Sequence, residues 1–247
     1  MTASRFFFIV LLGVFSSMSF AAVPRSLTPQ EPTSHKQVEE ALKLPLENRI
    51  QALKSHGPRV IDHLQTLSFD RRQNLEVRWR ALTVLPYLDK RIGQINIERA
   101  LAGNEWYLRN AAAVALPTLD REYALEASAK LLSDPALVVR TAAAQNLLRL
   151  NGKEKESLLW EKVNARENFS KGESLWVRRH IARALAEFAR SGSEAKFVAL
   201  LSDKDSRLHP FAIRALERLT GKKLNQDQSN LKEHRRRWMA WAQNQEP

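Results

Sequence analysis

Five arginines in the second half of the chain are spaced so that they could form one continuous basic surface. They are Arg149, Arg179, Arg183, Arg214 and Arg218. A guanidinium group binds carboxylate and phosphate groups through paired, charge-assisted hydrogen bonds. The whole chain is basic, with 39 Lys and Arg against 27 Asp and Glu and a formal net charge of +12. The sequence therefore predicts a surface for an anionic partner; the alternative is a solvated basic face without a ligand.

Residues for catalysis or metal binding do not form a recognisable set. The six histidines lie at positions 35, 56, 63, 180, 209 and 234, and none belongs to a His-Glu-x-x-His pattern. Neither the nucleophile elbow Gly-x-Ser-x-Gly nor a glycine-rich phosphate loop occurs. The chain contains no cysteine, which removes thiol catalysis and thiolate metal sites. We therefore expect no catalysis, no cofactor and no metal.

The helices that must position the arginines are visible as a repeat. Five stretches carry the anchor residues Arg78, Arg109, Arg140, Arg178 and His209, at intervals of 31, 31, 38 and 31 residues. Leucine lies seven residues after every anchor, and small residues, mostly alanine, recur three and six residues after it. These positions follow the i, i+3, i+4, i+7 spacing of one helical face. A period of this size is typical of solenoids, whose units bury their apolar faces by stacking.

A second, less regular helix is expected after each repeat helix, at 90–102, 121–132, 153–166 and 193–201. No segment has the period-2 pattern of a strand. The sequence therefore predicts an all-α fold, a right-handed α-solenoid of stacked helical hairpins with a period of about 31 residues. The longer third interval predicts a loop at 168–173, because Gly172 and a polar run disfavour a helix there.

The five arginines fall on the side of the repeat helices that faces away from the predicted core. They lie one, five or nine residues after the anchors of the third, fourth and fifth copies. The same positions in the first two copies hold uncharged residues, among them Trp79 and Tyr87. We therefore predict a concave side that is basic in its C-terminal half, with Trp79 and Tyr87 as secondary binding candidates. The other tryptophans are expected mostly to seal gaps between repeats.

One segment of the repeat resembles a known family. It reads Leu-Leu-Ser-Asp-Pro at 131–135, Val-Val-Arg-Thr-Ala-Ala-Ala at 138–144 and Leu-Leu at 147–148. This looks like the short bacterial HEAT repeat, also called the phycobilisome-lyase HEAT-like repeat. The resemblance covers residues 75–220. It implies stacked helical hairpins whose arginine-bearing helices line the concave side.

The resemblance also implies a ladder between repeats, in which an aspartate before each repeat helix pairs with an arginine near the helix start. Asp134 fits this position in the third copy and Asp203 in the fifth. The second copy offers only Asn104, and the fourth offers Gly172 and Glu173. We therefore expect a ladder that is broken in places. The family includes lyases that attach bilins, but nothing beyond the repeat supports that activity here.

The first residues have the composition of a secretory signal. Arg5 precedes an apolar run at 6–15, and a small-x-small cleavage pattern follows at 19–21. The run is shorter than the roughly 20 apolar residues that cross a bilayer, and an uncleaved N-terminal anchor is the alternative. We expect an exported protein, periplasmic or secreted. Its predicted parts are a signal peptide (1–21), a flexible leader (22–35), N-terminal capping helices (36–74), five HEAT-like repeats (75–220) and a C-terminal capping helix (221–247).

These features together predict an exported, monomeric scaffold or adaptor that binds a protein partner, with an acidic partner favoured, through its partly basic concave face. No transmembrane segment is expected after removal of the signal. Two other functions stay open: binding of an anionic envelope polymer or lipid, and an enzyme or enzyme subunit of the HEAT-like lyase type. Nucleic acid is a poor candidate, because the export signal argues against a genomic role.

Overall fold

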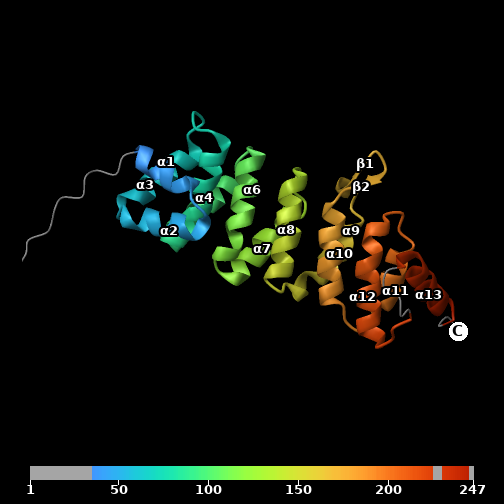
Figure 1. The fold of residues 1–247 in the computed structure, drawn as a ribbon. Helices are drawn as coiled ribbons and strands as arrows, with labels where there is room; N and C mark the ends of the chain where they lie inside the picture. The colour runs from blue at the N-terminus through green and yellow to red at the C-terminus, as the bar shows by residue number, and fades with distance from the viewer. Residues whose placement is uncertain (1–34, 225–229, 245–247) are drawn as a thin grey trace, which may run out of the picture. The chain divides into compact units, whose positions relative to one another are not determined.

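The computed structural model describes residues 35–224 and 230–244, so the predicted signal peptide and nearly all of the predicted leader lie outside the described residues. Short helices make up almost all of the described part (Figure 1). Their bounds are α1 (His35–Lys43), α2 (Leu46–Ser55), α3 (Arg59–Phe69), α4 (Leu75–Leu88), α5 (Lys90–Leu101), α6 (Trp106–Ala115), α7 (Arg121–Leu131), α8 (Leu137–Arg149), α9 (Glu156–Val163), α10 (Val177–Phe188), α11 (Glu194–Leu201), α12 (His209–Thr220) and α13 (Leu231–Gln243). The predicted all-α solenoid is confirmed.

Polar side chains fix where several of these helices begin. The Asn74 side chain accepts a hydrogen bond from the Val77 N–H at the start of α4. Asp89 and Asp120 cap α5 and α7 in the same way, by accepting from backbone N–H groups of the first turn. Such caps satisfy donors that have no partner inside the helix. Gly221 ends α12 in the left-handed conformation, with φ of 68°.

The repeat helices α4, α6, α8, α10 and α12 contact one another in sequence order and form a row (Figure 1). Each of α5, α7, α9 and α11 packs against a helix of this row. Close approach between the layers is visible at Gly93 of α5, where a Cβ atom would lie 2.4 Å from the Cα atom of Pro86 in α4. We call the side of the repeat helices that these second helices leave uncovered the repeat face.

The core lies between the two layers and follows the predicted helical phase. The five leucines at the position seven residues after each anchor are all fully buried: Leu85, Leu116, Leu147, Leu185 and Leu216. The alanines three residues after four of the anchors are fully buried as well: Ala81, Ala112, Ala143 and Ala212. Small side chains at this position let neighbouring helices approach closely, while the leucines fill the space between repeats.

The longer third interval is occupied by a loop, as predicted, but the loop is more ordered than the sequence indicated. The second helix of this unit, α9, is shorter than the expected 153–166, and a hairpin of two-residue strands follows it. These strands are β1 (Phe169–Ser170) and β2 (Glu173–Ser174), paired antiparallel. The turn between them places Lys171 and Gly172 at positive φ, 50° and 81°. The tight turn therefore depends on a glycine at its second position.

Buried arginine side chains connect successive repeats. Arg78 of α4 donates from Nη2 to Glu105 Oε2 at 2.8 Å. Arg109 of α6 donates from Nε and Nη2 to the Asp134 carboxylate at 2.7 and 3.1 Å. In each pair the acid lies in the turn that leads into the next repeat helix. The anchor arginine of one repeat is thus bonded to the turn that precedes the next repeat helix.

The ladder continues through the fourth repeat. Arg140 of α8 donates from Nε to Asn168 Oδ1 at 2.8 Å, so this step uses an amide in place of a carboxylate. Burial lowers the pKa of Arg140, and the charges of Glu167 and Asp134 oppose that shift. Arg178 of α10 is only 1% exposed and uses all five of its N–H donors.

The last step of the ladder joins Arg178 to Asp203, the acid before α12. Two guanidinium nitrogens donate to its carboxylate, at 3.2 and 2.5 Å. Burial opposes ionisation of Asp203, but the hydrogen bonds from Arg178 and from the Asp205 N–H outweigh it, so the pKa of Asp203 lies below its ordinary value. His209 replaces the fifth anchor, and its Nε2 lies 2.9 Å from the Asp203 carbonyl oxygen.

The expectation of a broken ladder was therefore wrong for the second copy, whereas in the fourth the ion pair is missing as expected and an amide hydrogen bond takes its place. Glu105, and not Asn104, supplies the partner in the second copy. Asn168, and not Gly172 or Glu173, supplies it in the fourth. The hairpin separates Asn168 from the helix it precedes, which hid it from a search at fixed spacing.

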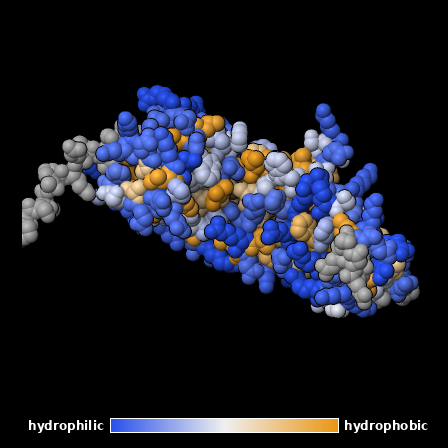
Figure 2. Space-filling view, viewed as in Figure 1, coloured by the Kyte–Doolittle hydropathy of each residue, from blue (hydrophilic) through white to orange (hydrophobic). Residues whose placement is uncertain are grey.

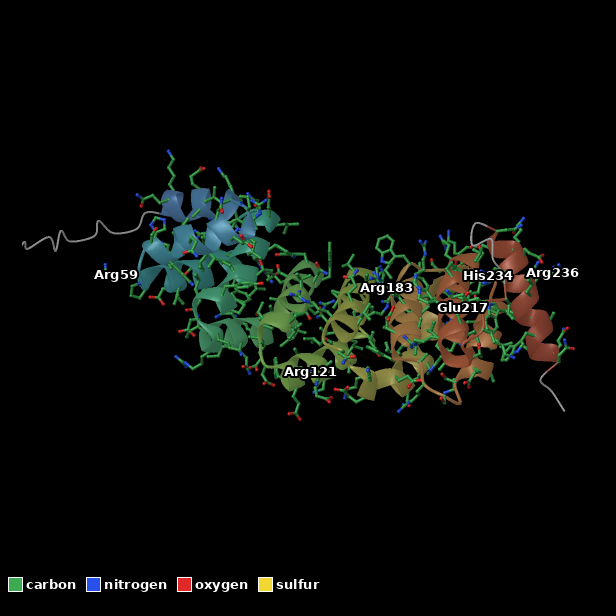
Figure 3. The ribbon with its side chains drawn as sticks, turned by 60° about the horizontal axis from the view of Figure 1, so that its bottom comes forward. Arg59, Arg121, Arg183, Glu217, His234 and Arg236 are labelled. Carbon is green, nitrogen blue, oxygen red and sulfur yellow. The ribbon has the colours of Figure 1, made fainter. Side chains whose placement is uncertain are left out.

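Helix α13 packs against α11 and α12 at the C-terminal end of the stack. Trp238 is fully buried there, and its ring lies edge-on to that of Trp241 at 5.2 Å. Buried His234 of α13 has its Nε2 3.2 Å from Glu217 Oε1 of α12 (Figure 3). This helix covers apolar surface that would otherwise end the stack exposed.

Removing the carboxylate of Asp134 should destabilise the fold strongly. The Arg109 and Asp134 side chains are only 11% and 5% exposed. In Asp134→Asn the guanidinium would stay buried without a counter-charge, which costs about 3–5 kcal/mol of unfolding free energy. Urea unfolding followed by circular dichroism measures this.

The matched control is Glu187→Gln, whose contacts with Arg214 and Arg218 are exposed and 3.8 and 3.7 Å long. Pairs of this kind contribute about 0–1 kcal/mol. Equal losses in the two variants would mean that the ladder does not hold the repeats together.

Candidate functional site

Three of the five predicted arginines lie on the repeat face without a counter-charge. Arg149 is the last residue of α8, and Arg183 lies in the middle of α10 (Figure 3); both are exposed. Within the described residues neither has an ion pair or a hydrogen bond from its guanidinium group. Arg179 is half-buried, also lacks a counter-charge there, and its buried Nε has no hydrogen-bond partner among the described residues. These three side chains can therefore take an external anion.

The other two predicted arginines have partners inside the protein. Arg214 and Arg218 of α12 both approach Glu187 of α10, at 3.8 and 3.7 Å. Arg218 also donates to the carbonyl oxygens of Ala186 and Ala189 at the end of α10, the second at 3.2 Å. The local pair Arg183–Glu187 that four-residue spacing allows is not formed, since Glu187 turns toward α12. Of the five predicted arginines, those without a counter-charge among the described residues therefore lie on α8 and α10.

The secondary candidates Trp79 and Tyr87 both lie on α4. Trp79 is half-buried and packs against the core, whereas Tyr87 is exposed. The tryptophans that reach the surface most are instead Trp106 and Trp176, each about half exposed. One signal in the sequence could have indicated them: both precede an anchor by two or three residues and so lie in the first turn of a repeat helix or just before it.

Trp176 lines a groove of about 230 Å³ that crosses α6, α8 and α10 on the repeat face. Its apolar wall consists of Trp176, Val114, Val138 and Ala142. The indole N–H donates to Thr141 Oγ1 at 2.8 Å, which ties α10 to α8. The indole is therefore held in place while half of its surface faces solvent. In Figure 2, scattered apolar residues reach the surface among hydrophilic ones.

The polar part of the groove is uncharged. It comprises Asn110, Thr141, Gln145 and His180. Asn110 Nδ2 donates to the Val138 carbonyl oxygen at 3.2 Å, and Gln145 Nε2 lies 3.4 Å from His180 Nδ1. Burial lowers the pKa of His180, and the charges of Arg183 and Arg179 lower it further. His180 is thus neutral at neutral pH.

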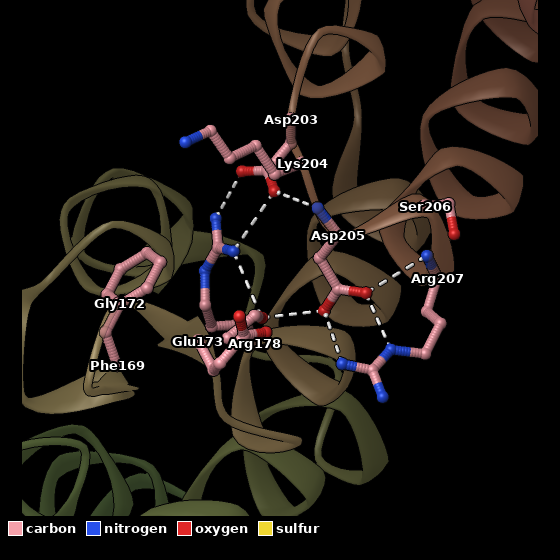
Figure 4. Close-up of a pocket in the computed structure, with 10 residues that line it drawn as sticks. Phe169, Gly172, Glu173, Arg178, Asp203, Lys204, Asp205, Ser206 and Arg207 are labelled. Carbon is pink, nitrogen blue, oxygen red and sulfur yellow. Dashed lines mark hydrogen bonds and ion pairs between the residues drawn. The ribbon is translucent and has the colours of Figure 1, made fainter.

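A second, polar pocket of about 410 Å³ lies between the hairpin and the turn before α12 (Figure 4). Its charges neutralise one another. Arg207 Nε donates to Asp205 Oδ1 at 2.6 Å, and Ser174 Oγ donates to Asp205 Oδ2 at 2.6 Å. Burial raises the pKa of Asp205, but these hydrogen bonds dominate and lower it to about 2. This network therefore holds the hairpin of β1 and β2 against the turn before α12.

The basic run at the C-terminus is also largely paired within the protein. Arg236 and Arg237 both donate to the Glu233 carboxylate, at 2.7 and 2.8 Å. Hydrogen bonds from Arg236 and then Arg237 lower the pKa of Glu233 to about 2. Arg235 donates to the Leu201 carbonyl oxygen at 2.5 Å. The run therefore contributes less free positive charge than its sequence suggests.

Two negative findings concern the described residues alone. No cluster of three or more His, Asp or Glu side chains in them is arranged to hold a metal ion. Among the same residues, no helix has the length and hydropathy needed to span a bilayer.

Comparison with known proteins finds only weak similarities, and these are to solved structures. No family model and no curated protein matches it. One similar solved structure is an engineered protein, with 20% identity over 74% of this chain and 96% of its own, and a TM-score of 0.46. Another is the complex of CpcE and CpcF of phycocyanin lyase from Nostoc sp. PCC7120, with 18% identity over 90% and 99% of the two chains and a TM-score of 0.40. Similarities at this level carry no argument about function.

The environment of His180 can be tested by titration. Its ring should titrate below the ordinary histidine pKa of 6.5. Arg183→Ala should move the midpoint upward, because a nearby positive charge is lost, and Arg59→Ala on α3 should leave it unchanged. Since the folded state disfavours the protonated ring, this residue's contribution to stability is lost as the pH falls below about 6.5. Ring proton NMR measures the midpoint, and an unchanged value in Arg183→Ala would contradict the proposed electrostatics.

Proposed function

We propose that the chain is an exported scaffold or adaptor that binds a protein partner through its repeat face, and that the contact is centred on α8 and α10. The observation that carries the proposal is the absence of any counter-charge for Arg149, Arg179 and Arg183 within the described residues, beside the half-exposed ring of Trp176. Catalysis forms no part of the proposal.

The composition of this surface favours a protein over a simple polyanion. Arginine and tryptophan are the residues most enriched at the energetically dominant positions of protein interfaces. A polymer bound through its charge alone would need only a basic field, and Arg214 and Arg218 have part of their charge offset by Glu187. An anionic envelope polymer or lipid is the alternative occupant, and its binding would weaken steeply with added salt because exposed charges are screened over about 8–10 Å.

Charge reversal on the repeat face should abolish binding and leave the fold intact. In Arg149→Glu with Arg183→Glu, both changed side chains are exposed and form no ion pair or guanidinium hydrogen bond within the described residues. The matched control is Arg59→Glu with Arg91→Glu, on α3 and α5, which changes the net charge by the same amount at exposed positions. We expect the first variant to lose its partner in affinity capture from envelope extract and the control to retain it, with equal melting temperatures.

Three outcomes would count against this proposal. If both double variants lose the captured protein equally, net charge and not the repeat face determines binding. If the first variant keeps the same partners, the contact lies elsewhere, with the α4 residues Trp79 and Tyr87 next to be tested. Capture that disappears between low and physiological salt for the parent and both variants would favour the polyanion.

Export makes a prediction that does not depend on the binding surface. The small-x-small pattern at 19–21 favours cleavage before Ala22. The protein recovered from the envelope or the medium of the producing cells should therefore begin at Ala22, as measured by intact mass spectrometry. Recovery of the uncleaved chain in the membrane fraction would instead support an N-terminal anchor.

A further inference from the structure

The groove across α6, α8 and α10 has the size of a site for one side chain. Its volume of about 230 Å³ lies below the range of about 300–1,000 Å³ that is typical of small-molecule pockets. It is open along the repeat face and crosses three successive repeats. An extended or helical segment of another protein could therefore insert one residue and continue along the face on either side.

The apolar wall of the groove is built in advance of any ligand. The Trp176 indole is fixed by its hydrogen bond to Thr141 Oγ1, and the Thr141 hydroxyl donates in turn to the Leu137 carbonyl oxygen at 2.9 Å. Trp176 is 50% exposed and Val114 41% exposed. A rigid aromatic ring loses little conformational entropy when it is covered, so burial of this wall is available to a partner at small cost.

The charge beside the groove has one sign. Arg179 and Arg183 follow Trp176 by three and seven residues, which is the spacing of one helical face. Neither forms an ion pair within the described residues, and none of the groove-lining residues is a carboxylate. His180, between the two arginines in sequence, is held in its neutral form, so the groove itself stays uncharged.

We infer that this groove binds one large apolar side chain of an acidic segment of a partner protein, whose neighbouring carboxylates pair with Arg179 and Arg183. The inference rests on the proposed function and specifies its partner. The apolar wall requires an apolar residue, and the two guanidinium groups without counter-charges require acids beside it. An acidic polysaccharide has no large apolar group that would fill the groove.

Selection from a random peptide display library on the purified protein tests this chemistry directly. We expect the enriched peptides to combine one Leu, Ile, Phe, Trp or Met residue with flanking Asp or Glu. Synthetic peptides of the consensus sequence should bind Arg183→Glu and Trp176→Ala at least about tenfold more weakly than the parent, a loss of about 1.4 kcal/mol. Arg183 is exposed and forms no ion pair or guanidinium hydrogen bond within the described residues, so we expect that variant to keep its fold.

Matched controls separate the groove from exposed aromatic and basic residues elsewhere. Trp106→Ala removes a tryptophan of similar exposure outside the groove lining, and Arg59→Glu reverses a charge on α3. Both should bind the consensus peptide like the parent. A peptide with Lys in place of Asp and Glu, and one with Ser in place of the apolar residue, should each bind more weakly.

The outcomes distinguish this inference from the proposed function. The inferred groove site is overturned if the consensus peptide lacks acids or lacks an apolar residue. It is also overturned if that peptide binds Trp176→Ala and Arg183→Glu as tightly as the parent. In either case the proposal of a protein-binding scaffold still stands. Both the groove site and the proposed function are overturned if no peptide is enriched and the protein instead binds heparin or vesicles rich in anionic lipid. That binding must be lost in Arg149→Glu with Arg183→Glu. Failure to enrich any peptide without such binding overturns the groove alone.

Discussion

The buried arginine between successive repeats is the interaction on which the stack depends. A guanidinium group carries five donors and a charge that cannot be removed by deprotonation, so burying it is costly unless every donor finds an acceptor. Arg178 meets this demand with bonds to Val163 and Asn164 at the end of α9, to Ser174 of β2, and to Asp203 in the segment between α11 and α12. These loops are thereby fixed relative to the helix. The apolar core has no comparable directionality, because leucine contacts tolerate small displacements that a paired hydrogen bond does not.

The same residue type has opposite roles one position apart. Arg178 is buried and fully bonded, whereas Arg179 is half-buried and keeps a charge without a counter-ion in the described structure. The difference follows from the helical phase, since a step of about 100° carries a side chain from the inter-repeat seam to the repeat face. Fixing the anchor therefore fixes the direction of the residues one and five positions later. Trp176, Arg179 and Arg183 are oriented by the ladder although none of them is part of it.

The helical phase and the core could be read from the sequence because they depend on local spacing alone. The leucines at 85, 116, 147, 185 and 216 are buried as that spacing requires. The ladder partners Glu105 and Asn168 could not be read, because the path of each turn decides which polar atom reaches the guanidinium. The pairing of Arg214 and Arg218 with Glu187 depends on the distance between α10 and α12. The groove was hidden for the same reason, since its walls come from three repeats.

A solvated basic face and a binding face differ in what the surface leaves unsatisfied. Exposed arginines alone fit either description, because water and salt neutralise them readily. A half-exposed indole that is held by a hydrogen bond adds fixed apolar area that a partner could cover, and a purely solvated basic face has no use for such area. The two features have different ranges. In the proposed contact, charge on Arg149 and Arg183 would act over about a Debye length and orient an approaching partner, whereas the groove would discriminate only on contact. The combination supports the proposal that this surface selects an acidic protein segment for both its charge and its shape.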